Sequence, residues 1–120
     1  MAGVLVDTDV CIDHLAGLVR LPGRRARLGY SVITRAELRA GANGMAETEA
    51  VRRLLGTMTE YPVDRQIADE AGRIRQEHGL RLPDALIAAT ALVHGLAVHT
   101  RNRRHFARVS GLRLRPGPAR

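Results

Sequence analysis

The chain has 120 residues, of which 45% are hydrophobic and 26% are charged. This composition leaves room for one domain of ordinary size and disfavours multi-domain, disordered, collagen and coiled-coil proteins. The formal net charge is +7 and all nineteen basic residues are arginine, which points to an anionic partner such as nucleic acid or an acidic protein segment, although a GC-rich genome explains the absence of lysine equally well.

In the first half of the chain, strands and helices are predicted to alternate. Short apolar runs typical of buried strands are followed by capping residues and then by apolar residues at helical spacing. In chain order the prediction is a strand at Gly3–Val6, a helix at Asp9–Ala16, a loop or short helix at Arg20–Arg27, a strand at Leu28–Ile33, a helix from Thr34 to Gly41 or Gly44, and a helix at Ala46–Met58.

The second half continues this alternation. In chain order we predict a strand at Tyr61–Val63, a helix from the Asp64 cap to Gly79, a buried apolar helix at Pro83–His94, a strand at Ala97–Thr100, a short helix at Asn102–Ala107 and an edge strand at Leu112–Leu114. Strands that alternate with helices predict a single α/β domain over residues 1–120, with three layers (α/β/α) and a mostly parallel central sheet.

Four polar residues fall at predicted strand ends or helix starts, where ligands bind in such sheets. They are Asp7, Glu37, Asp84 and Asn102. Each has a structural explanation as well: Glu37 fits a capping box with Thr34, Asp84 can complement a helix dipole, and Asp7 and Asn102 suit a turn and a cap. Gathered at one edge, however, carboxylates ~4 Å apart repel by about 4 kcal/mol per pair at an effective dielectric near 20. A hard divalent cation such as Mg²⁺ would relieve that repulsion.

Four stretches of the chain carry a resemblance to a known family. They are VDTDVCIDHLAG (Val6–Gly17), SVITRAELRAGA (Ser31–Ala42), PDALIAATALVHGLAVHTRNRRHF (Pro83–Phe106) and GLRL (Gly111–Leu114). In this order they resemble PIN-domain ribonucleases, specifically VapC-type toxins of type II toxin–antitoxin pairs, over almost the whole chain. The resemblance implies a PIN-like fold and endonucleolytic hydrolysis of RNA by a metal-activated water.

The resemblance also implies roles for the four polar residues. Asp7, Glu37 and Asp84 would form an acidic metal site for Mg²⁺ or Mn²⁺, with Asp7 and Asp84 the most direct ligands. Glu37 would act through metal-bound water or orient the attacking water. Asn102 stands at the family's more variable fourth position and would support the site by hydrogen bonding.

Further expectations concern partners. The resemblance implies a homodimer and a cognate VapB-type antitoxin, a segment of which occludes the active-site groove. Our first choice for RNA phosphate contacts is Arg101, Arg103 and Arg104, and our second is Arg35 and Arg39; a solvated basic face is the alternative. Because aromatic residues are only 2% of the chain, recognition should depend on arginine and shape rather than on base stacking.

Two features depart from the family pattern. Asp9 stands where relatives commonly have Ser or Asn, so it either adds a charge to the site or caps the first helix, and we favour the cap. The segment Arg20–Arg27 is shorter than the helical region that many relatives have there, which puts any clamp or dimer surface made by that region in doubt.

The run DTDVC also resembles the first motif of haloacid-dehalogenase-like phosphatases, but Cys11 replaces the usual Thr or Val and the chain has no lysine. A receiver-like phosphoacceptor domain fails for the same want of lysine, whereas a non-catalytic RNA-binding module stays open. The single cysteine and the acidic N-terminal region, unlike a signal peptide, predict a soluble cytoplasmic protein.

Overall fold

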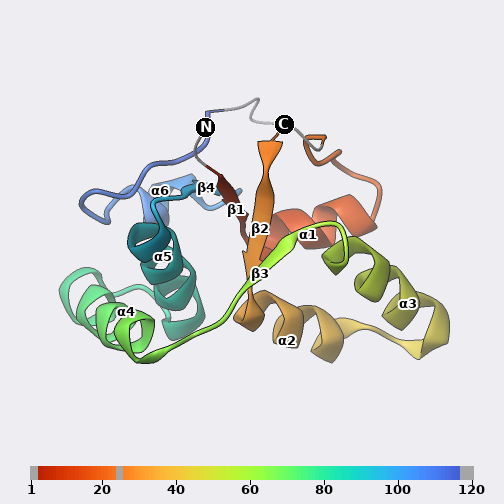
Figure 1. Ribbon diagram of the computed structural model, residues 1–120, viewed down its shortest axis with the longest axis horizontal. Helices are drawn as coiled ribbons and strands as arrows, with labels where there is room; N and C mark the ends of the chain where they lie inside the picture. The colour runs from red at the N-terminus through yellow and green to blue at the C-terminus, as the bar shows by residue number, and fades with distance from the viewer. Residues whose placement is uncertain (1–2, 24–25, 117–120) are drawn as a thin grey trace.

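A parallel sheet forms the centre of the molecule (Figure 1). The structure, a computed structural model, describes residues 3–23 and 26–116. Over these residues the sheet has four strands, β1 (Val4–Val6), β2 (Leu28–Ser31), β3 (Thr59–Tyr61) and β4 (Ala97–His99). Their order is β3-β2-β1-β4, and every pairing is parallel, in agreement with the mostly parallel sheet that was predicted.

Helices cover both faces of the sheet and make the three-layer arrangement expected from the sequence (Figure 1). One face carries α1 (Thr8–Leu15), α2 (Val32–Gly41) and α3 (Gly44–Leu55). The other face carries α4 (Arg65–His78), α5 (Leu82–His94) and α6 (Arg103–Phe106). Among the described residues, no helix is both long enough and apolar enough to cross a membrane.

Two hydrophobic cores follow from the alternation of side chains along the strands. On β1, Leu5 packs with α4 and α5, whereas its neighbour Val6 packs with the helices of the opposite face, and both are fully buried. Helix α5 is the most deeply buried helix, because small alanines such as Ala88 and Ala89 let it approach the sheet closely.

Apart from the C-terminal edge strand, the predicted helices and strands are confirmed to within a few residues. Strand β2 ends at Ser31 rather than Ile33, because the Ser31 side chain accepts a hydrogen bond from the Ile33 backbone N–H and so caps α2. The capping box proposed for Thr34 and Glu37 is therefore wrong: the helix has already begun at Val32, and Glu37 lies in its second turn.

The C-terminal edge strand is reduced to one parallel bridge between Val98 and Leu114. In the segment Arg20–Arg27, residues 24 and 25 lie outside the described residues, and the remainder contains no α-helix. Helix α5 ends as predicted at Gly95, whose φ of 66° is the left-handed conformation that glycine adopts readily.

Candidate active site

The topology brings the ends of β1 and β4 together. From β1 the chain moves outward through β2 to β3 and then returns to place β4 on the other side of β1. Parallel α/β sheets bind ligands beyond the carboxyl ends of strands at such a switch point. Asp7 follows β1 and Thr100 follows β4, and the Thr100 hydroxyl donates a hydrogen bond to Asp7 Oδ2 at 2.8 Å.

Asp7 is a buried carboxylate with only 3% of its surface exposed. It caps α1, where Oδ1 accepts a hydrogen bond from the Thr8 N–H at 2.8 Å. Burial raises the pKa of Asp7 to about 7; the Thr100 hydrogen bond opposes this rise, and the charges of Asp9 and Asp84 add to it. Asp7 forms no ion pair with any described basic residue, so no described cationic side chain compensates its charge.

Glu37, on α2, is linked to the end of β1 by a hydrogen bond from Thr8. The Thr8 hydroxyl donates to Glu37 Oε1 at 2.6 Å and lies 2.9 Å from the Thr34 hydroxyl. Because Thr8 has one hydroxyl hydrogen, Thr34 is the donor in the second contact. A polar link therefore runs from α2 to the residue that directly follows Asp7.

Asp84 lies in the first turn of α5, as predicted, and its side chain is 18% exposed. Helix α5 begins at the carboxyl edge of the sheet, so Asp84 in its first turn lies close enough for its charge to raise the pKa of Asp7. Its partner is Arg81, whose Nε is 3.6 Å from Asp84 Oδ2. This ion pair is within one helix turn and partly exposed.

Asn102 occupies the N-cap position of α6, but its side chain makes no capping hydrogen bond. Its backbone N–H donates to Thr100 Oγ1 at 2.9 Å, and its Oδ1 contacts His105 Nδ1. The single Thr100 hydroxyl thus connects the backbone of Asn102 with the carboxylate of Asp7.

Asp9 does not cap α1, contrary to the favoured interpretation, because Asp7 is the cap. It lies in the first turn, where its charge raises the pKa of Asp7. Its partner is Arg101, whose Nη2 is 3.8 Å from Asp9 Oδ2. The same guanidinium donates through Nη1 to Asp13 Oδ1 at 3.2 Å.

Thr8 and Thr100 link Asp7, Glu37 and Asn102 by hydrogen bonds, whereas Asp84 is related to them only through the effect of its charge on the pKa of Asp7. Across residues 3–23 and 26–116, no three acidic, histidine or cysteine side chains are arranged as a ready-made metal site. The donor set nevertheless fits a hard divalent cation, which prefers oxygen ligands and keeps several waters of its own. The charge of the buried Asp7, which no described cationic side chain compensates, is the observation that favours a cation there.

Two residues that hold this site together, Thr8 and Thr100, were missed in the sequence analysis. Neither titrates nor binds metal strongly, so neither stands out by residue type. Their positions were nonetheless informative, since Thr8 directly follows Asp7 and Thr100 ends the predicted β4 segment two residues before Asn102.

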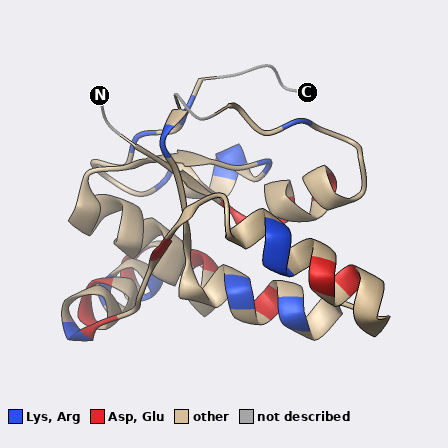
Figure 2. Cartoon of the chain, turned by 45° about the vertical axis from the view of Figure 1, so that its right-hand side comes forward, with Lys and Arg blue, Asp and Glu red and all other residues tan. Residues whose placement is uncertain are grey.

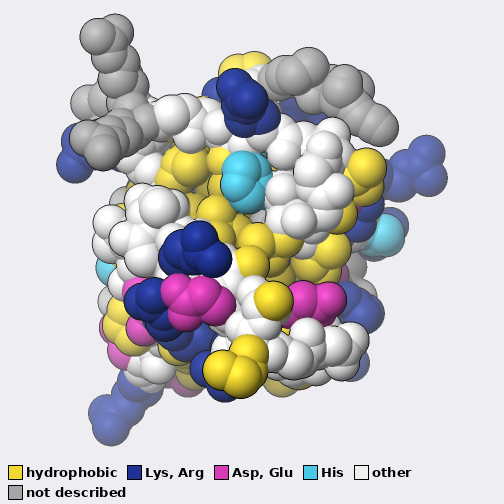
Figure 3. All heavy atoms as spheres, turned by 90° about the vertical axis from the view of Figure 1, so that its right-hand side faces the viewer, with side chains coloured by type: hydrophobic (Ala, Val, Ile, Leu, Met, Phe, Trp, Pro, Cys, Tyr) yellow, Lys and Arg dark blue, Asp and Glu magenta, His cyan; other side chains and the backbone are white. Residues whose placement is uncertain are grey.

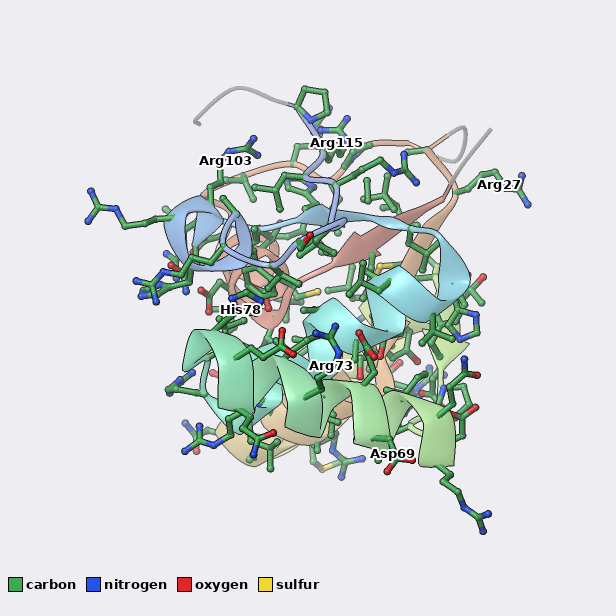
Figure 4. All side chains as sticks on the ribbon, turned by 90° about the vertical axis from the view of Figure 1, so that its left-hand side faces the viewer. Arg27, Asp69, Arg73, His78, Arg103 and Arg115 are labelled. Atoms are coloured by element: carbon green, nitrogen blue, oxygen red, sulfur yellow. The ribbon has the colours of Figure 1, made fainter. Side chains whose placement is uncertain are left out.

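The positive charge is concentrated in the C-terminal part of the chain. Residues 1–94 hold twelve basic and twelve acidic residues, whereas residues 95–120 hold seven arginines and no acid. The helices before β4 accordingly carry both signs of charge (Figure 2). Arg103 and Arg115 lie close together after β4, where Arg103 Nη1 donates to the Arg115 carbonyl at 2.9 Å (Figure 4).

Comparison with known proteins agrees with these features. The PIN domain family matches residues 4–112. Ribonuclease VapC10 of Mycobacterium tuberculosis is 40% identical over 114 residues, which cover 86% of this chain and 85% of the relative. Ribonuclease VapC19 of the same organism is 33% identical over 114 residues, covering 85% and 90%.

A solved structure of DNA-bound VapBC from Salmonella typhimurium superposes with a TM-score of 0.82 at 29% identity, and covers 96% of this chain and 98% of the other. A toxin–antitoxin complex from Klebsiella pneumoniae gives a TM-score of 0.76 at 32% identity, covering 92% and 95%. The chain therefore belongs to the PIN-domain family, within its group of VapC-type proteins.

Proposed function

We propose that this chain is an endoribonuclease, the toxin of a VapBC-type pair, and that it hydrolyses RNA phosphodiesters with the help of Mg²⁺ or Mn²⁺. The observation that carries the proposal is the buried Asp7 at the switch point of the sheet, linked by hydrogen bonds to Thr100 and Thr8 and compensated by no described cationic side chain. The names of the VapC10 and VapC19 ribonucleases, to which this chain is similar, support the choice of RNA as substrate.

In this proposal Asp7, Asp84 and Glu37 hold the metal ion. A bound ion would supply Lewis-acid chemistry, by which it would polarise a phosphoryl oxygen, favour deprotonation of a water and stabilise a leaving oxygen. Asp7 is kept in place by the Thr8 N–H and the Thr100 hydroxyl. Glu37 uses one oxygen to accept from Thr8, so its other oxygen is available to orient the attacking water. Asn102 supports the site by hydrogen bonding.

RNA phosphates are proposed to contact Arg101, Arg103 and Arg104, which flank Asn102. Arg35 and Arg39 are the second choice. Of these two, Arg35 is engaged by Glu60 and by the Tyr30 hydroxyl, whereas Arg39 is exposed and has no acidic partner among the described residues. Arg39 is therefore the better candidate.

A VapB-type antitoxin is the proposed protein partner, and an apolar groove between α1, α2 and α3 is where we place its inhibitory segment. The groove has a volume of about 370 Å³. Its apolar lining includes Ile12, Leu15, Leu38, Ala42 and Val51. Glu37 lines it as well, so a segment in the groove would reach the active site. Hydrophobic side chains gather on this side of the molecule (Figure 3).

The groove assignment has a direct test. Ile12→Lys should weaken capture of the co-expressed antitoxin while RNA cleavage by the isolated chain is retained. Met45→Lys is the matched control, because Met45 is 89% exposed and does not line the groove. Equal capture by both variants would place the antitoxin elsewhere. The family also implies a homodimer, which light scattering of the purified chain will measure.

The main experiment is RNA cleavage by the purified chain with Mg²⁺, with Mn²⁺ and with EDTA. We expect cleavage only with metal, and loss of cleavage in Asp7→Ala and Asp84→Ala. Asp69→Asn is the control, since Asp69 lies on α4 and points away from the sheet (Figure 4). Cleavage in EDTA would overturn the mechanism. Turnover of small phosphate esters would favour the phosphatase, and RNA binding without cleavage would favour the binding module.

A further inference from the structure

Asp13 is a buried carboxylate that the proposed mechanism does not use. It lies in the second turn of α1, and its side chain is only 10% exposed. A buried carboxylate is costly unless it is paired and hydrogen-bonded. Its partner is Arg101, 88 residues away in sequence, whose Nη1 donates to Asp13 Oδ1 at 3.2 Å.

The Arg101 guanidinium is hydrogen-bonded to Asp13 through Nη1, and the rest of it is accessible to solvent. The side chain is 59% exposed, and Arg101 lies between Thr100, which holds Asp7, and Asn102. Its Nη2 is 3.8 Å from Asp9 Oδ2, which is too long for a hydrogen bond. A guanidinium has five N–H donors in a fixed plane, so most donors of Arg101 remain available beside the active site.

We propose that Asp13 is a positioning residue that holds the Arg101 guanidinium toward the RNA phosphate at the active site, and that Asp9 competes with this phosphate for Nη2. The proposal rests on the proposed function, because it takes RNA as the substrate. A pre-oriented arginine loses less side-chain freedom when it binds a phosphate. Arg104 has no acidic partner among the described residues and lacks this advantage.

The two aspartates make opposite predictions, although both lie on α1 and both face the same arginine. If only net charge mattered, replacing either aspartate with asparagine would strengthen RNA binding. In the proposed arrangement Asp9→Asn tightens binding, because Nη2 loses a competitor. Asp13→Asn weakens binding, because Arg101 loses the carboxylate that orients it.

The experiment measures RNA affinity in an Asp7→Asn background, so that the RNA stays intact. Fluorescence anisotropy with a labelled single-stranded RNA and Mg²⁺ should show Kd raised about 5- to 10-fold by Asp13→Asn, and lowered by Asp9→Asn. In chains that also carry Arg101→Ala, Asp13→Asn should leave Kd unchanged. In the cleaving chain, Asp13→Asn should raise KM and leave kcat nearly constant.

Arg101→Lys keeps the test decisive if Asp13→Asn fails to fold. Lysine retains the positive charge but lacks the planar guanidinium, so it cannot bind Asp13 and a phosphate with separate N–H groups in a fixed geometry. The Kd for RNA should therefore rise nearly as much as in Arg101→Ala. Binding by Asp13→Asn that is equal to or tighter than the parent's, or full affinity in Arg101→Lys, would overturn the inference. Absence of RNA cleavage by the unmodified chain would instead overturn the proposed function.

Discussion

Thr100 donates its hydroxyl hydrogen to Oδ2 of Asp7 at 2.8 Å, although 93 positions separate the two residues. The same hydroxyl oxygen accepts the N–H of Asn102. Pairing of β1 with β4 sets this contact, because Val6 is in register with His99 at the ends of the two strands. One hydroxyl therefore fixes two candidate site residues relative to each other.

Replacing this hydroxyl should impair the site more than the fold. Thr100→Val keeps the shape of the side chain but removes the donor to Asp7 and the acceptor for Asn102. Loss of outer hydrogen bonds to a metal ligand typically costs 10- to 100-fold in metal affinity or activity, and we expect ~10-fold or more in kcat/KM for RNA. Thr100→Ser should recover most of the activity. A fully active Thr100→Val chain would contradict this role.

Asp7 should make the stability of the metal-free protein depend on pH. Its pKa is about 7 in the folded chain, against an ordinary value of 3.8, so the unfolded chain releases this proton first as pH rises. The contribution of Asp7 to stability therefore falls between about pH 4 and pH 7 and stays low above pH 7. Asp7→Asn should stabilise the protein by about 1–3 kcal/mol at pH 8 in EDTA, and give no such gain below pH 4.

Urea denaturation of the two chains at both pH values measures this difference. Asp69→Asn, an exposed change on α4, is the control for a general effect of charge. An Asp7→Asn chain that is equally stabilised at pH 4 and pH 8 would show that ionisation of Asp7 is not the cause.

The sequence predicted the edge of the sheet at which the candidate site residues lie, and the reason is physical. Parallel strands end at one edge, so Asp7 after β1 and Asn102 after β4 were expected at the same edge. That they are neighbours follows from the strand order β3-β2-β1-β4, which the alternation of strands and helices does not determine. Asp84 followed because the apolar helix that precedes β4 must begin at that same edge. These three placements depend only on topology.

What depends on side-chain contacts was harder to predict. The T-x-x-E pattern at Thr34 suggested a cap, but Ser31 forms the cap, and both Thr34 and Glu37 turn toward Thr8 instead. Arg101 was expected to contact phosphates, but its pairs with the acids on α1 were not predicted. Such pairs join residues far apart in sequence, and the packing of α1 against the segment after β4 decides them.

The Thr8–Thr34 contact should reveal itself in stability. Thr8→Val leaves the buried Thr34 hydroxyl without the partner it has in the folded chain, and an unsatisfied buried hydroxyl costs about 1–3 kcal/mol. The double variant Thr8→Val, Thr34→Val removes both polar groups and should be more stable than Thr8→Val alone. Urea denaturation measures both, and additive losses in the double variant would contradict the contact.

Metal binding should stabilise the folded chain through Asp7. At a free Mg²⁺ concentration ten times its Kd, the gain is about 1.4 kcal/mol, which corresponds to roughly 6 °C in Tm for a chain of this size. Thermal denaturation with and without Mg²⁺ should show this shift for the natural sequence and for the Asp69→Asn control. The same shift in Asp7→Asn would mean that Mg²⁺ binds away from the proposed site.

Gly29 should be far less tolerant of a methyl group than Gly72, although both lie inside regular elements. A Cβ on Gly29 would overlap Cε2 of Tyr61 and lie 3.1 Å from the Thr59 carbonyl oxygen on the paired strand. The Tyr61 ring packs against His94 at a centroid distance of 4.7 Å, which limits movement of the Tyr61 ring. The Thr59 carbonyl belongs to the strand β3 that pairs with β2, so it cannot move away easily. Gly29→Ala should therefore lower the free energy of unfolding by about 1–3 kcal/mol. A Cβ on Gly72 would meet no atom within 4 Å. Gly72→Ala should therefore raise the free energy of unfolding by up to ~1 kcal/mol, since alanine favours a helix interior. Urea denaturation at pH 7 compares the two variants, and a Gly29→Ala chain as stable as the parent would mean that β2 and β3 can separate more easily than their register suggests.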